Sequence, residues 1–336
     1  MNAPLTLKDY ETDQEVRWCP GCGDYAILKT VQKLMPTLGV PKEKTVFISG
    51  IGCSSRFPYY MNTYGFHTIH GRAPAVATGV KLANPELDVW MVTGDGDGLS
   101  IGGNHMIHAL RRNVDMQILL FNNEIYGLTK GQYSPTSKVG TKSPSTPDGS
   151  IDQPLDPAAF ALGVGARFVA RGIDTEAKTL TPLLARAHAH KGTSFVEIYQ
   201  NCNVYNDGIF ELVKNKKNAA HTRLMLEHGE PMLFGADREK GLRLNMKTLA
   251  LEIVTIGENG VSLDDILVHD ETNITIAQLL SRIHSPDFPE PFGVLYCNPT
   301  QAFVEDVYSQ RIAVRETKGP SDVNSILRGG HTWTVA

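Results

Sequence analysis

Short apolar runs alternate with helical patterns from Lys44 to Gln200, and this alternation constrains the fold more than any other feature. Strands are expected where the runs are rich in β-branched residues, at 44–49, 66–70, 88–93, 116–122, 167–170 and 194–199. Helices are expected where apolar residues follow the 3.6-residue period, at 24–38, 73–84, 100–112, 156–163 and 175–190. This rhythm is typical of a doubly wound, mainly parallel α/β sheet with helices on both faces.

A turn rich in glycine and aspartate follows one of these strands. The strand DVWMVT runs directly into GDGDG (94–98), and a helical segment begins near Ser100. In sheets of this kind, ligands bind beyond the carboxyl ends of the strands. Glycines let the backbone approach an anion closely, and a helix N-terminus offers free N–H groups, so a diphosphate fits this turn. The two aspartates would repel a diphosphate unless a divalent cation intervened, and Mg²⁺ takes carboxylate and phosphate oxygens together.

A pair of asparagines at the end of another strand supports this interpretation. The strand MQILLFN ends in Asn122 and Asn123, and Asn123 stands 28 residues after Asp95. Adjacent strand ends can therefore place Asp95 and an amide oxygen on one metal ion. A Gly-Asp run is often only a turn, but the asparagine pair favours a functional site.

Three competing motifs fit this turn less well. An EF-hand counted from Asp95 fails, because it would place Leu99 and Met106 at ligand positions. A dinucleotide fingerprint fails because Leu99 stands where its third glycine is required. Residues 98–102, GLSIG, match a hydrolase nucleophile elbow, but an elbow serine must follow its strand at once and this strand ends near Thr93. Ser100 is expected to be a helix cap instead.

Four of the five cysteines are spaced as ligands. Cys19 and Cys22 form a C-x-x-C loop, while Cys53 and Cys202 each follow an expected strand on the same edge of the sheet. Four thiolates suit zinc or a [4Fe–4S] cluster, and thiolate geometry alone does not separate the two. One close pair joined by two distant ligands favours the cluster over a zinc ribbon. Cys297, in the strand-like GVLYC, is expected to be an inert core residue.

Composition excludes other classes of function. The 336 residues carry a net charge of -4, so no dense basic surface for nucleic acid is expected. The N-terminus lacks the apolar core of a signal peptide, and no run reaches the ~18 apolar residues of a membrane span. A soluble, cytoplasmic protein is therefore predicted, in a reducing compartment where disulfides are disfavoured.

The rest of the chain divides into a loop and an extension. Residues 133–157 are rich in Pro, Ser, Thr and Gly without an apolar period, and loops of this length are usually functional or mobile. The pattern is irregular after about Asn203. We therefore expect two parts, a cofactor-binding α/β domain at 1–202 and a C-terminal extension at 203–336 that packs on this domain or on a partner.

Five motifs in sequence carry a family resemblance. They are WCPGCG (18–23), IGCSS (51–55), HGRA (70–73), GDGD (94–97) and NNEIYGLTKGQ (122–132). In this order they resemble the β subunit of 2-oxoacid:ferredoxin oxidoreductases, enzymes with the thiamine-diphosphate-binding fold. The similarity is dense over about residues 15–210 and continues less specifically to the C-terminus.

The resemblance implies three resident cofactors: thiamine diphosphate, Mg²⁺ and one [4Fe–4S] cluster. It assigns the cluster to Cys19, Cys22, Cys53 and Cys202, and Mg²⁺ to Asp95, Asn123 and the carbonyl of Ile125. Other contacts to thiamine diphosphate are expected from Gly94, Gly96, Asp97, Gly127, Leu128, Cys53 and His70. His70, Arg56 and Lys130 are the candidate catalytic residues, and the alternative for each is a structural or solvated side chain.

The activity implied is the oxidative decarboxylation of a 2-oxoacid to acyl-CoA and CO₂, with coenzyme A as co-substrate and electrons passing through the cluster to ferredoxin. The C-terminal region and the motif PEPFGVLY resemble the 2-oxoglutarate type, and the reverse, carboxylating direction is feasible. An α subunit carrying the pyrimidine-binding domain is expected, in an (αβ)₂ assembly. The alternatives are a non-redox thiamine-dependent decarboxylase or synthase with structural zinc, and a noncatalytic electron-transfer or scaffold subunit.

Overall fold

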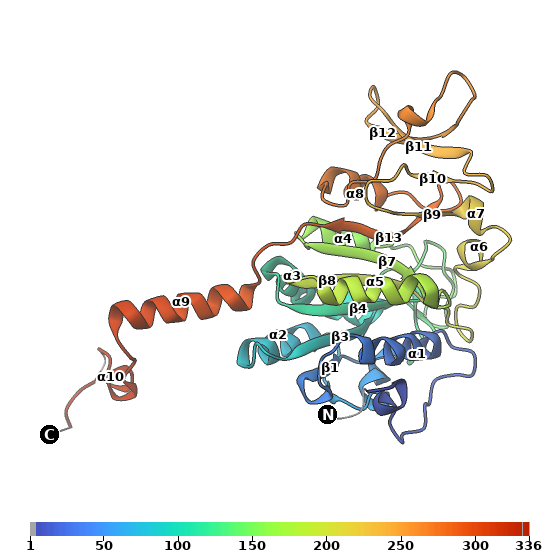
Figure 1. The fold of residues 1–336 in the computed structure, drawn as a ribbon. Coiled ribbons are helices and arrows are strands. Elements are labelled where there is room, and N and C mark those ends of the chain that lie inside the picture. Colours follow the sequence, from blue (N-terminus) through green and yellow to red (C-terminus); the bar gives the residue numbers. More distant parts are fainter. Residues whose placement is uncertain (1–4, 331, 336) are drawn as a thin grey trace.

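An eight-stranded sheet forms the centre of the computed structural model, which describes residues 5–330 and 332–335 (Figure 1). All neighbouring strands pair in parallel except β13 with β7, which confirms the predicted mainly parallel sheet. The strands in spatial order are β2 (Tyr64–His67), β1 (Thr45–Ser49), β3 (Asp88–Gly94), β4 (Met116–Asn122), β8 (Thr193–Tyr199), β7 (Phe168–Ile173), β13 (Glu290–Cys297) and β9 (Arg223–Met225).

Helices cover both faces of this sheet, and each face has its own core. On β4, Ile118 and Leu120 join one core while Leu119 and Phe121 join the other, because successive side chains of a strand point to opposite faces. This burial on both faces explains why the strands read as continuous apolar runs. The first core includes α2 (Ala73–Ala83), α3 (Gly103–Arg112) and α4 (Pro157–Gly163), and the second includes α1 (Asp24–Leu34) and α5 (Ala177–Ala189).

The carboxyl ends of the central parallel strands lie at one edge of the sheet. Gly94 at the end of β3 pairs with Phe121 of β4, and Asn122 at the end of β4 pairs with Tyr199 at the end of β8. The turns that follow these strands are therefore neighbours, as the sequence predicts for a ligand site.

The C-terminal part is more regular than predicted. Its strands β9 and β13 complete the central sheet, so the expected boundary after Cys202 stays a prediction. A separate sheet contains β10 (Leu233–Phe234), β11 (Lys240–Asn245) and β12 (Ala250–Thr255), and the short helices are α6 (Glu211–Lys214), α7 (Ala219–Thr222) and α8 (Ile274–Leu280). Helix α9 (Phe303–Lys318) projects from the body and leads to α10 (Val323–Leu327) (Figure 1).

The long loop and the helices can be compared with the sequence predictions. The hairpin β5 (Ile125–Tyr126) and β6 (Gln132–Tyr133) is followed by the long predicted loop, in which residues 134–156 form no helix or strand in the described structure. Across residues 5–330 and 332–335, the helices fall short of the length and apolar character needed to cross a membrane.

Candidate active site

One pocket at the carboxyl edge collects every residue that the sequence assigned to thiamine diphosphate. It lies where the turns after β1, β2, β3 and β4 meet, and it encloses about 70 Å³. The predicted residues that line it are Cys53, His70, Gly94, Asp95, Gly96, Asp97, Asn123, Ile125, Gly127 and Leu128. The structure therefore brings these ten residues together from four segments.

The glycine turn leaves room only for backbone. A Cβ added at Gly96 would overlap the ring of Tyr126, whose hydroxyl donates to the Gly96 carbonyl at 2.9 Å. The chain then enters a π-helical turn (Asp97–Ile101) before α3 begins at Gly103. The prediction that Ser100 caps a helix is wrong, because it lies inside the π-helical turn while Gly102 precedes α3.

Asp95 is a buried carboxylate held by the long loop. Its Oδ2 accepts hydrogen bonds from Ser134 Oγ at 2.5 Å and Thr136 Oγ1 at 2.6 Å. Burial nevertheless raises the pKa of Asp95, so its charged form gains from a nearby cation. No sequence pattern indicates that these two hydroxyls reach Asp95, because only tertiary contact brings the loop to the turn.

The predicted magnesium ligands share this pocket. Asn123 donates from Nδ2 to Gln200 Oε1 at 2.8 Å, and its Oδ1 accepts the Ile125 N–H at 3.2 Å. The lining of the pocket includes a carboxylate, a carboxamide and a main-chain carbonyl, which supply the oxygen donors that Mg²⁺ takes. The residues present therefore fit the ion.

Asp97 has a different role from its neighbour. Its Oδ1 accepts from Gly71 N at 2.7 Å, Ile51 N at 3.2 Å and His70 Nδ1 at 2.5 Å, and its Oδ2 accepts from Thr93 Oγ1 at 2.7 Å. These donors come from three separate segments. Asp97 lines the pocket, but its carboxylate holds the turns after β1 and β2 against β3.

Two of the four candidate cluster cysteines, Cys53 and Cys202, lie at the same pocket, next to Gly127. A Cβ added at Gly127 would lie 3.5 Å from Cys53 Sγ and 3.6 Å from Cys202 Sγ, so these sulfurs are at most 7.1 Å apart, the sum of the two distances. Burial, the charge of Asp24 and the thiols of Cys202 and Cys19 raise the pKa of Cys53 to about 12.

The thiol of Cys22 is influenced by two of the other cysteines. Burial and Asp24 raise the pKa of its thiol, and Cys202 and Cys53 add to the increase. The donor set of four thiols fits an iron–sulfur cluster or zinc, either of which requires them as thiolates. Within the described residues, no three His, Cys, Asp or Glu side chains already stand at the spacing of a metal site.

Known proteins resemble this chain. Residues 50–198 match the family model of the thiamine pyrophosphate enzyme C-terminal TPP-binding domain. The 2-oxoglutarate oxidoreductase subunit KorB of Mycobacterium tuberculosis is 48% identical, over 99% of this chain and 89% of its own length. The chain belongs to the family of 2-oxoacid:ferredoxin oxidoreductase β subunits. The resemblance inferred from the motifs and the thiamine-diphosphate-binding fold are both confirmed.

A further relative and a solved structure agree with this family. The β subunit of the Saccharolobus solfataricus 2-oxoacid:ferredoxin oxidoreductase is 46% identical over 56% of this chain and 63% of its own length. A solved structure, described as 2-oxoglutarate:ferredoxin oxidoreductase from Magnetococcus marinus with 2-oxoglutarate, coenzyme A and succinyl-CoA bound, aligns with a TM-score of 0.76 and 34% identity. That alignment covers 98% of this chain and 97% of the solved one.

Three residues expected in this β subunit's chemistry or core lie outside the pocket. Arg56 packs against Tyr59 and Tyr60, with its Nε donating to Tyr60 Oη at 2.9 Å. Lys130 is exposed and has a positive φ of 76°. Cys297 is half-buried at the opposite edge of the sheet, where it pairs with Phe168 at the start of β7 and packs against the second core.

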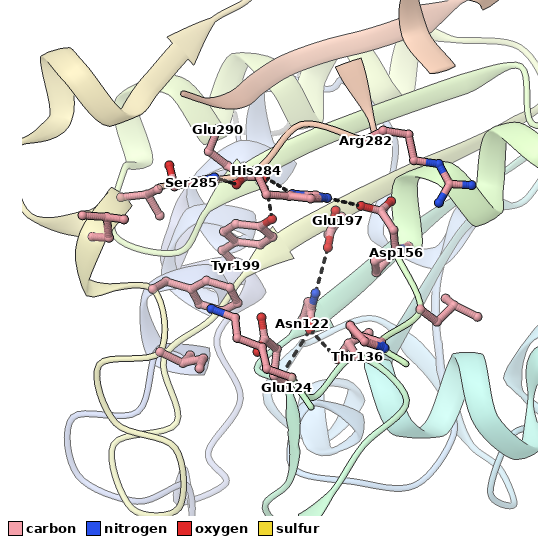
Figure 2. Close-up of a pocket in the computed structure, with 18 residues that line it drawn as sticks. Asn122, Glu124, Thr136, Asp156, Glu197, Tyr199, Arg282, His284, Ser285 and Glu290 are labelled. Atoms are coloured by element: carbon pink, nitrogen blue, oxygen red, sulfur yellow. Dashed lines mark hydrogen bonds and ion pairs between the residues drawn. The ribbon is translucent and has the colours of Figure 1, made fainter. Parts of the chain in front are cut away.

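This β subunit has a second, larger cavity of about 400 Å³, whose lining residues are drawn in Figure 2. This cavity and the pocket are linked by Thr136, which lines the cavity and donates from Oγ1 to Asp95 Oδ2 of the pocket at 2.6 Å. Inside the cavity, Thr136 Oγ1 also donates to Asn122 Oδ1 at 3.1 Å, and Asn122 Nδ2 donates to Glu197 Oε1 at 2.8 Å. Glu124 also lines this cavity, and burial raises its pKa to about 7. No motif in the sequence predicted this cavity.

Charged side chains line this cavity and are paired with a buried arginine behind its lining. Arg171 is fully buried and binds Glu197 Oε2 through Nε at 2.8 Å and Glu290 Oε1 through Nη1 at 2.7 Å. His284 lies 3.0 Å from Asp156 Oδ2 and 3.1 Å from Glu290 Oε1 (Figure 2). Burial opposes the charge of His284, but these carboxylates outweigh it and raise the pKa to about 9. Charged residues inside otherwise apolar strands were the available signal in the sequence.

Proposed function

We propose that the chain is the β subunit of a 2-oxoglutarate:ferredoxin oxidoreductase. The reaction would convert 2-oxoglutarate and coenzyme A to succinyl-CoA and CO₂, with release of one proton and transfer of two electrons to ferredoxin. The observation that carries the proposal is the position of Gly127, which lines the thiamine pocket and packs against the sulfurs of Cys53 and Cys202. A redox centre held there would adjoin the site of decarboxylation.

The residues of the pocket have separate roles in this proposal. Asp95, Asn123 and the carbonyl of Ile125 would hold Mg²⁺, and the glycines of the turn would admit the diphosphate. When bound, thiamine diphosphate supplies the carbanion that attacks the 2-oxo carbon. Asp97 holds His70 through Nδ1, which leaves Nε2 as the nitrogen that can exchange a proton in the pocket.

The cluster would be held by Cys19, Cys22, Cys53 and Cys202, and would take electrons one at a time. Lys130 and Arg56 lie outside the pocket, where they would meet the substrate carboxylate or the phosphates of coenzyme A. The names of the relatives support 2-oxoglutarate as the substrate, because both the mycobacterial protein and the solved structure carry it.

An α subunit would complete the active site. Apolar side chains are exposed on segments that border the pocket, namely Phe66 in the edge strand β2, Ile69 after that strand, Ile101 after the glycine turn and Leu128 in the pocket lining. Exposed apolar groups of this kind mark protein interfaces. They support docking of the pyrimidine-binding domain over this edge, within an (αβ)₂ assembly that also reacts with ferredoxin.

The test uses the chain copurified with its α subunit. CoA-dependent reduction of ferredoxin should be faster with 2-oxoglutarate than with pyruvate, and should require both subunits. Preference for pyruvate would overturn the substrate assignment, and full activity of this chain alone would overturn the subunit assignment. Anaerobically purified protein should be brown and contain iron, whereas the zinc alternative predicts colourless protein.

A further inference from the structure

A buried glutamine lies between the two proposed cofactor sites. Gln200 directly follows β8 and is 1% exposed. Its Nε2 donates to Cys22 Sγ at 3.2 Å and to the Asn201 carbonyl at 2.8 Å, while its Oε1 accepts from Asn123 Nδ2 at 2.8 Å. Its main-chain N–H donates to the carbonyl of Asn122 at 2.9 Å, which fixes it to the end of β4. Every donor of this side chain is used, and its oxygen contacts a candidate magnesium ligand.

This network fixes the orientation of both amides. The carbonyl of Asn201 can only accept a hydrogen bond, so the nitrogen of Gln200 must face it and the oxygen must face Asn123. Asn123 then turns its own nitrogen toward Gln200, which leaves its Oδ1 on the side of Ile125. That oxygen is the atom proposed to bind Mg²⁺.

The contact with sulfur has its own chemical consequence. A cluster gains negative charge on its sulfurs when it is reduced, and an N–H donor to a ligating sulfur stabilises that charge. The Gln200 donor at Cys22 would therefore favour the reduced cluster and raise its reduction potential. Its carboxamide oxygen would act separately, by orienting Asn123 from outside the metal's own ligands.

We propose that Gln200 is a positioning residue shared by both cofactor sites, tuning the cluster through Cys22 and orienting Asn123 toward Mg²⁺. The inference rests on the proposed function, because it takes the cluster and the metal to be held as described there. It deepens the proposal by naming one side chain that touches a ligand of each site.

The experiment uses the αβ complex, reconstituted anaerobically with iron and sulfide. Gln200→Met removes both hydrogen bonds with little change in volume, whereas Gln200→Glu keeps an oxygen for Asn123 but has no N–H for Cys22. Asn203→Ala is the matched control, because Asn203 Nδ2 donates to the Pro20 carbonyl of the same cysteine loop at 2.6 Å without contacting sulfur. One readout is the cluster midpoint potential from an EPR-monitored titration, and the other is Mg²⁺-dependent affinity for thiamine diphosphate from calorimetry.

Gln200→Met should shift the midpoint potential to a more negative value and weaken Mg²⁺-dependent binding by roughly 10- to 100-fold. Gln200→Glu should shift the potential in the same direction while its Mg²⁺-dependent affinity stays closer to that of the wild type. Asn203→Ala should change neither property. Unchanged values in Gln200→Met, or equal changes in Asn203→Ala, would overturn the role of Gln200. A wild-type complex that forms no cluster or binds no thiamine diphosphate would instead overturn the proposed function itself.

Discussion

Replacing Asp97 with alanine should destabilise the chain strongly, because one carboxylate holds three turns together. Its four donors are Thr93 Oγ1, His70 Nδ1 and the N–H groups of Gly71 and Ile51. The bonds from Thr93 and Gly71 are fully buried. Each hydrogen bond to a charged group contributes roughly 1.5–3 kcal/mol, so losing these two should lower the free energy of unfolding by about 3–6 kcal/mol.

Asp97→Asn should be much milder than Asp97→Ala. An asparagine keeps one oxygen for the N–H groups of Gly71 and Ile51, and its NH₂ group can donate to the hydroxyl of Thr93. Asp152→Ala is the matched control, because Asp152 is exposed and accepts a bond from Tyr133 Oη, so its loss should change stability by no more than about 0.5 kcal/mol.

The assay is equilibrium unfolding in urea, followed by intrinsic fluorescence, with the free energy taken from the linear dependence on denaturant. The expected order of stability is wild type, Asp152→Ala, Asp97→Asn and then Asp97→Ala. If Asp97→Ala were as stable as Asp152→Ala, the reasoning that Asp97 organises the pocket would be refuted.

Three further perturbations test the buried charges and the glycine turn. The pKa of His284 rises from 6.5 to about 9 on folding, so its stabilising effect is complete below pH 6.5 and is lost as pH rises through 9. His284→Gln should flatten this part of the stability–pH profile in urea titrations, and an unaltered profile would contradict the assignment. Arg171→Met should cost about 3–5 kcal/mol in the same assay, because buried carboxylates lose their partner, and a loss under 1 kcal/mol would argue against it. Gly96→Ala should abolish thiamine diphosphate binding in calorimetry, since its Cβ would overlap Tyr126. If the variant bound thiamine diphosphate with the affinity of the wild type, the backbone at residue 96 would not approach the cofactor closely.

The parallel strands could be predicted because both of their faces are buried. The expected strand at 116–122 coincides with β4, and those at 88–93 and 194–199 differ from β3 and β8 by one residue at one end. The strand predicted at 66–70 is shifted from the edge strand β2, because Tyr64–His67 is exposed and carries no such apolar run. Its position depends on pairing with β1, which local sequence does not encode.

The strands of the C-terminal part depend on distant partners. β13 pairs with β7, more than 100 residues earlier in the chain, and β9 is only three residues long. Strand β11 contains no long apolar run, because its sequence KGLRLN mixes charged and apolar residues. Pairing between distant segments therefore determines where the strands of this region form.

The residues of the candidate site also fall into two groups, those that local sequence predicts and those that only tertiary contact brings into place. Glycines, aspartates and cysteines at strand ends could be predicted, because the carboxyl ends of parallel strands meet at one edge. Ser134 and Thr136 could not, since a loop without periodicity gives no indication of which carboxylate it reaches. Gln200 was missed for a related reason, because only the folded chain brings Cys22 and Asn123 to its two ends.

The central claim is that a thiamine pocket adjoins a cluster held by four cysteines. It is tested most directly by EPR spectroscopy of the anaerobic αβ complex after addition of 2-oxoglutarate. The account predicts the signal of a reduced [4Fe–4S] cluster that depends on thiamine diphosphate and Mg²⁺ and disappears in Cys202→Ser. An oxidised or absent cluster after addition of substrate, in protein that binds thiamine diphosphate, would contradict it.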